Sequence, residues 1–138
     1  FIYLNNNELI VFHIKGASNK NKTRKISTSA FEVVCGQALK NIKFSQLDNV
    51  VDHLKRKNIN RRIWKNGNMV TLDKCLIDLS KNTLTKKSIV VFQPHLKESH
   101  IKDTMNRDHR QKTLEALLYS VNKSCKGIDV NFYLIADK

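Results

Sequence analysis

The sequence predicts an α/β domain with a mixed sheet, built from an N-terminal hairpin, a C-terminal parallel strand-helix-strand unit and helices on both faces. Three observations predict this class. Two short apolar runs flank an Asn cluster at residues 5–7, two further apolar runs lie at 89–92 and 130–136, and helical periodicity fills the segments between them. We expect residues 1–138 to form a single domain of a longer polypeptide, because neither a repeat nor a linker divides them.

The first elements are a hairpin and a helix. Residues 1–4 and 8–14 read as two strands, because the Asn residues between them tolerate turn conformations. Ser29 and Glu32 have the spacing of a capping box and predict the start of a helix. That helix carries one apolar face, made of Phe31, Val34, Cys35, Ala38, Leu39 and Ile42.

Two shorter helices are predicted in the middle of the chain. One starts at Ser45 and ends near Asn58 with a strongly basic last turn, and the other is capped by Thr71. Between them, Asn66 and Gly67 form a turn signal.

The C-terminal part predicts a strand, a crossover helix and a second strand. The run at 89–92 is apolar without a break and is closed by Pro94, which should prevent its continuation as a central strand. A helix opening at Thr104 or Asn106 and ending at residues 126–127 leads into the apolar run at 130–136. The two strands should therefore be parallel neighbours or near-neighbours with a right-handed crossover.

Composition limits the classes of function. The chain has 25 Lys+Arg and 12 Asp+Glu, a net charge of +13, which favours DNA or RNA as a partner. Its apolar runs are too short to cross a membrane and it opens with no signal peptide, so we expect a cytoplasmic, non-secreted protein that does not bind membranes. The three cysteines are far apart, which predicts small buried thiols rather than disulfides or a zinc site.

Two basic segments are candidates for binding phosphates. Both lack acidic residues, and the second surrounds the only Trp, whose ring could stack on a base. The candidate residues are Lys20, Lys22, Arg24 and Lys25 in the first segment, and Lys55, Arg56, Lys57, Arg61, Arg62, Trp64 and Lys65 in the second. The alternative is a solvated basic surface with Trp64 half-buried in the core.

One local sequence pattern indicates a candidate catalytic site. The strand ends in the run FHIKG at residues 12–16, and the helix after the next loop carries Glu32 and the run GQALK at 36–40. This pattern resembles the restriction-endonuclease-like nuclease superfamily, in which a strand ends in an acidic residue, a spacer and Lys, and the next helix often carries Gln or Glu. The resemblance implies a metal-dependent phosphodiester hydrolase, with His13, Lys15 and Gln37 as catalytic residues and His13 as a ligand of Mn²⁺ or Mg²⁺.

Strand alternation predicts that His13 and Lys15 look into one cleft, while Glu8 points to the opposite face. His13 stands where the family has its acid, and imidazole suits Mn²⁺ better than Mg²⁺ because hard cations prefer oxygen ligands. Three functions stay open: a nuclease or a degenerate relative of one, a non-catalytic DNA- or RNA-binding module of a larger protein, and a protein-interaction domain for an acidic partner. In the last two, Lys15 is a solvated strand-end residue and His13 an ordinary hydrogen-bonded histidine.

Overall fold

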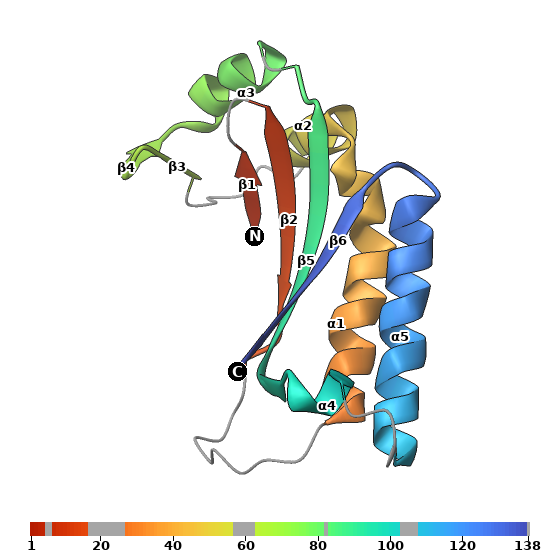
Figure 1. Cartoon of the computed structure of the whole chain (residues 1–138). Helices are drawn as coiled ribbons and strands as arrows, with labels where there is room; N and C mark the ends of the chain where they lie inside the picture. Colours follow the sequence, from red (N-terminus) through yellow and green to blue (C-terminus); the bar gives the residue numbers. More distant parts are fainter. Residues whose placement is uncertain (5–6, 17–26, 57–62, 82, 103–107, 138) are drawn as a thin grey trace.

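The computed structural model describes residues 1–4, 7–16, 27–56, 63–81, 83–102 and 108–137 (Figure 1). In this part of the chain, the main sheet has four strands in the order β1-β2-β5-β6. The strands are β1 (Ile2–Leu4), β2 (Glu8–Ile14), β5 (Lys86–Lys97) and β6 (Asn131–Asp137). β1 is antiparallel to β2, and β2, β5 and β6 are mutually parallel. The α/β class, the mixed sheet, the N-terminal hairpin and the parallel C-terminal unit are confirmed.

The described helices are α1 (Thr28–Asn41), α2 (Leu47–Arg56), α3 (Leu72–Ser80), α4 (Ser99–Lys102) and α5 (His109–Lys126), with a 3-10 turn at Ile42–Ser45. A separate two-stranded hairpin consists of β3 (Ile63–Lys65) and β4 (Asn68–Val70). The helix expected from Ser45 to Asn58 is α2, which begins at Leu47 because Ser45 is the last residue of the 3-10 turn; residues 57–58 lie outside the described residues.

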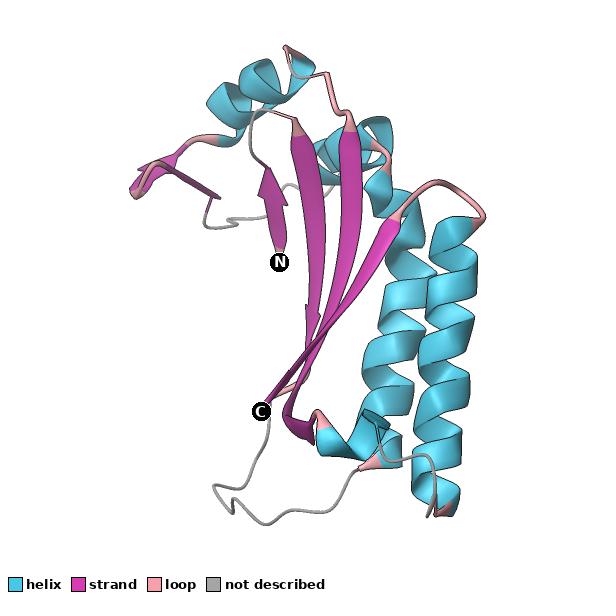
Figure 2. Ribbon diagram, in the orientation of Figure 1, coloured by secondary structure: helices cyan, strands magenta, loops and turns pink. Residues whose placement is uncertain are grey.

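The two long helices, α1 and α5, cover the same face of the sheet, as Figure 2 shows. Alternate strand residues such as Val11, Ile89 and Val91 are buried there against an apolar core, to which α1 adds Phe31, Val34, Cys35 and Ala38, and α5 adds Leu114, Val121 and Cys125. We expected helices on both faces of the sheet. The two long helices share one face, and the reason is topological. The parallel strands advance in one direction, from β2 to β5 to β6, and right-handed crossovers in one direction place their helices on one face.

Two helices, α1 and α5, are capped by other residues than those that the sequence predicted. Ser27 caps α1, two residues before the predicted cap, and its Oγ accepts a hydrogen bond from the N–H of Ala30 at 3.4 Å. Asp108 caps α5 in a capping box with Gln111. The predicted openings, Thr104 and Asn106, lie outside the described residues, whereas the predicted end of α5 at Lys126 is confirmed.

Pro94 does not end β5, contrary to our prediction, because the strand continues to Lys97. The last pair between β2 and β5 is Ile14 with Phe92, and the pairing of β5 with β6 shifts between Phe92 and Lys97. Pro94 therefore lies beyond the regular pairing of β5, where its missing N–H removes no hydrogen bond between strands. Strands accept proline at such positions.

Candidate nucleic-acid interface

His13 lies on the helix-covered face of β2, together with Leu9 and Val11, and is only 6% exposed. Its Nε2 has no hydrogen-bond partner within the described part of the chain. Burial lowers the pKa of His13, and the positive charge of the amino terminus lowers it further. The prediction that His13 looks into an open cleft is wrong, because the face that it shares with Leu9 and Val11 is packed against helices.

Lys15 and Gln37 are both exposed, in different parts of the molecule. Lys15 follows the last residue of β2, and its backbone N–H donates to the carbonyl of Phe92 at 3.2 Å. Gln37 lies nine residues after Thr28, the first residue of α1, which is about 13 Å along the helix. Since α1 begins at the end of the sheet toward which β2 runs (Figure 1), the structure brings Lys15 near His13 but leaves Gln37 further along the helix.

Sequence reasoning missed Gln93, which is as buried as His13 and lies on the same face of the sheet. Gln93 follows Val91 by two residues on β5, and Val91 pairs with His13 on β2. The Oε1 atom of Gln93 also has no hydrogen-bond partner among the described residues. The detectable signal was a polar residue at the end of a continuous apolar run, directly before Pro94. Two unsatisfied polar groups thus lie close together where the pairing of β2 with β5 ends, near the carboxyl end of β2, and the carboxyl ends of parallel strands are where α/β sheets bind ligands.

The described residues contain no group of three or more His, Cys, Asp or Glu side chains that could hold a metal ion. Glu8 points to the face opposite His13, as predicted, where it accepts a hydrogen bond from the Ser88 hydroxyl at 2.9 Å and lies 3.4 Å from Lys86. The donors near His13 do not fit the oxygen-rich set that Mg²⁺ needs. Binding of Mn²⁺ or Mg²⁺ at His13 therefore stays a prediction.

Trp64 is 61% exposed on β3, so the alternative of a half-buried core residue is wrong. Its partner across the hairpin is Met69, which is also exposed. Asn66 and Gly67 form the predicted turn, with positive φ at both residues, as a tight two-residue hairpin requires. This turn places a large aromatic ring and a thioether side by side on one exposed surface.

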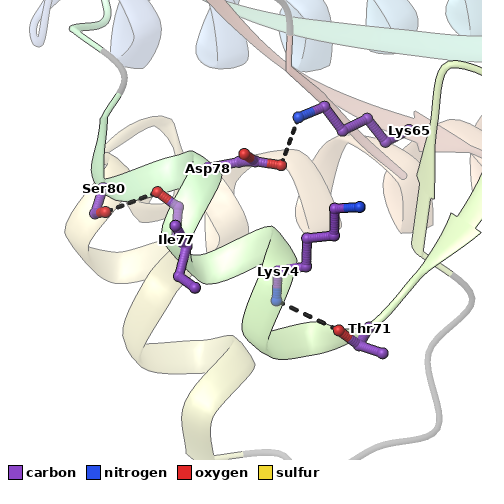
Figure 3. A network of polar contacts seen from close by, with 6 residues as sticks. All are labelled: Lys65, Thr71, Lys74, Ile77, Asp78 and Ser80. Atoms are coloured by element: carbon purple, nitrogen blue, oxygen red, sulfur yellow. Dashed lines mark hydrogen bonds and ion pairs between the residues drawn. The ribbon is translucent and has the colours of Figure 1, made fainter.

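The other face of this hairpin is attached to α3 (Figure 3). The Nζ of Lys65 donates to Oδ2 of Asp78 at 2.7 Å, and this hydrogen bond lowers the pKa of Asp78. Thr71 caps α3 as predicted, by accepting a hydrogen bond from the Lys74 N–H at 3.4 Å. Lys65 is therefore held by Asp78, which makes it less available to a phosphate than its sequence position suggested.

Lys55 and Arg56 end α2 and are exposed. Arg56 lies 3.6 Å from Asp52, one helical turn earlier, and both side chains are largely in solvent. Such surface pairs contribute little, so Arg56 can exchange Asp52 for a phosphate at small cost. The other predicted phosphate-binding residues lie outside the described residues: Lys20, Lys22, Arg24, Lys25, Lys57, Arg61 and Arg62.

The thiols match the prediction for two of the three cysteines. Cys35 and Cys125 are buried in the core between α1 and α5, while Cys75 is half-buried on α3. Burial raises the pKa of all three thiols, that of Cys35 to about 11. These cysteines therefore stay protonated near neutral pH and are poor nucleophiles.

Comparison with protein-family models, with curated proteins and with solved structures gave no match for this chain. Within the described residues, we find no helix whose length and apolar character would let it cross a membrane.

Proposed function

We propose that this chain is a nucleic-acid-binding domain that contacts DNA or RNA through the β3–β4 hairpin and the cations near it. The observation that carries the proposal is the exposure of Trp64 on a strand that follows the basic end of α2. An exposed Trp is costly to keep in water unless a partner covers it, and a base offers a flat surface of matching size.

Charge supports the same partner. With a net charge of +13, the chain attracts a polyanion, and each phosphate that it neutralises releases condensed counterions. Stacking of one base on an aromatic ring adds about 1–3 kcal/mol and does not depend on sequence. The structure therefore favours binding with low sequence preference and strong salt dependence.

The test is fluorescence anisotropy with labelled single-stranded and duplex DNA and RNA over a range of salt concentrations. We expect affinity to fall steeply as salt rises, and Trp64→Leu to weaken single-strand binding by roughly 5- to 150-fold, which corresponds to the stacking energy. Trp64→Phe, which keeps a ring, is the matched control and should retain most of the affinity. Absence of binding at about 50 mM salt, a low salt concentration at which counterion release strongly favours binding, would refute the proposal and favour an acidic protein partner.

A second candidate is metal-dependent phosphodiester hydrolysis near His13. The two unsatisfied polar groups of His13 and Gln93, which lie where the pairing of β2 with β5 ends, support it. A cleavage assay with Mn²⁺ and with Mg²⁺ separates this function from binding alone. We expect an active chain to prefer Mn²⁺ and Lys15→Ala to abolish cleavage while leaving binding at Trp64 intact. A wild-type chain that cleaves with neither ion would exclude this candidate.

A further inference from the structure

The face of the main sheet opposite α1 and α5 carries a continuous set of aromatic and aliphatic side chains. Tyr3 is 52% exposed and Tyr133 is 46% exposed, and Ile14 and Ile135 are exposed on the same face. Strand parity places them there, because the alternate residues of β2, β5 and β6 point to the helix-covered core. Soluble domains rarely leave such a surface without a partner.

The register of the strands aligns the rings in a row across the sheet. Phe12 pairs with Val90, and Val90 pairs with Tyr133, so two aromatic residues flank one small residue. Neighbouring strands are about 4.8 Å apart, which places the Phe12 and Tyr133 backbones roughly 10 Å from each other. Val90 is buried between them, so a small side chain separates the two rings. Tyr3 on β1 pairs with Ile10, two residues before Phe12, and therefore lies in the neighbouring row of the same face.

The charge of the chain decides between possible partners for this surface. Two copies that each carry +13 repel one another, which disfavours self-association through this face. A polyanion is attracted, and cations lie at both ends of the face: the exposed Lys15 follows Ile14, and the half-exposed Lys86, which lies 3.4 Å from Glu8, begins β5. In Figure 1 the β3–β4 hairpin with its exposed Trp lies beyond β1, on the side of the sheet away from α1 and α5.

We propose that this open sheet face binds single-stranded nucleic acid by stacking bases on Tyr3, Phe12 and Tyr133. The proposal rests on the proposed function and names its substrate class. A single strand can turn its bases outward onto a flat row of rings, whereas a duplex keeps its base faces covered by their neighbours. Asn131 is exposed in the next row of the same face and offers a polar group to base edges.

The test compares substitutions of exposed tyrosines on opposite sides of the molecule. Tyr133→Leu keeps an apolar side chain but removes the ring, and Tyr133→Phe keeps the ring. Tyr119 on α5 is 66% exposed on the helical side, so Tyr119→Leu is the matched control. The probes are a fluorescein-labelled oligouridine of about 12 nucleotides, close to the length that one stacking domain covers, and a duplex of the same length.

We expect Tyr133→Leu to weaken oligouridine binding by roughly 5- to 150-fold, the effect of one lost stack, and to leave duplex binding unchanged. Tyr133→Phe and Tyr119→Leu should bind oligouridine as the wild type does. Circular dichroism of each variant establishes that it is folded.

Four results would overturn the inference. If Tyr133→Leu and Tyr3→Leu both bind oligouridine like the wild type while Trp64→Leu does not, the open face is not the site and the proposed function survives. If Tyr133→Phe loses as much as Tyr133→Leu, stacking is not the cause. If sedimentation shows a dimer that Tyr133→Ser dissociates, the face joins two copies instead. Failure of the wild type to bind any probe refutes the proposed function as well.

Discussion

The two faces of the main sheet are made by the same strands but have opposite environments. Ile89 on β5 is completely buried beneath α1 and α5, whereas Ile135 on the neighbouring β6 is 44% exposed on the other face. Both residues belong to apolar runs that look alike in the sequence. The difference arises because the crossovers between the parallel strands pass on one side only.

This contrast shows that hydrophobicity marks a strand and does not tell which of its faces will be covered. The covered face supplies most of the buried apolar surface and therefore most of the stability. The open face contributes less to folding and is free to bind a partner. The same contrast predicts how substitutions on the two faces should differ.

The largest effect is expected for Ile89→Ala on the covered face. Removing three buried carbon atoms and leaving a cavity should lower the free energy of unfolding by about 2–5 kcal/mol. Urea denaturation followed by circular dichroism measures it. The graded control Ile89→Val should cost only about 0.5–1.5 kcal/mol, and equal effects of the two variants would contradict a tightly packed face.

The next largest effect is expected from His13, which makes the free energy of unfolding depend on pH. Because burial lowers its pKa below the usual 6.5, the folded chain keeps His13 neutral where the unfolded chain binds a proton. His13 should therefore reduce the free energy of unfolding as the pH falls below 6.5, by at most about 1.4 kcal/mol per pH unit.

His13→Leu should remove that dependence and should not lower stability at pH 7, because it replaces an unsatisfied buried polar group by an apolar one. Denaturant titrations of both chains between about pH 5 and pH 8, the range in which an imidazole titrates, isolate the contribution of His13 from those of the other histidines. A strong loss of stability in His13→Leu at pH 7 would show that the imidazole has a partner.

A smaller effect is expected at the exposed N-terminal cap of α5, one of the helices that cover this face. The Gln111 N–H donates to Oδ1 of Asp108 at 2.9 Å, and the Asp108 N–H donates to Oε1 of Gln111 at 2.9 Å. Asp108→Ala should lower the free energy of unfolding by about 1 kcal/mol, whereas Asp108→Asn, which is also a good cap, should change it little. Thermal melts of the three chains measure this, and an equal loss in both variants would mean that charge rather than capping is responsible.

The smallest effect is expected for Ile135→Ala on the open face. Its side chain already contacts water, so its truncation should change the free energy of unfolding by about 0.5 kcal/mol or less. The same urea titration as for Ile89→Ala makes the comparison direct. A loss as large as that of Ile89→Ala would show that the open face is covered within the chain itself.

Much of the secondary structure was readable from the sequence by itself. The apolar spacing of α1, the run that became β5, the Asn66-Gly67 turn and the Thr71 cap all predicted their elements, because short-range sterics and hydrogen bonds govern these features. Parallel pairing of β5 and β6 also followed, since the helix between them makes any other connection difficult. Basic composition alone predicted the class of partner, which stays a prediction.

Tertiary structure alone decided which side of each strand is covered. His13 on β2 and Lys15, which follows the last residue of β2, have the same parity in the sequence, yet His13 is enclosed by the core and Lys15 is in water, because the core ends where the strand ends. Gln93 became notable only when the pairing of Val91 with His13 placed it near another unsatisfied group. Trp64 gave no local sign of its exposure, since a ring in a basic segment can as well turn inward; the Lys65–Asp78 bond fixed the opposite face of its hairpin on α3. Local pattern determined the elements of this protein, and the direction in which the strands are added to the sheet determined which of their side chains can meet a partner.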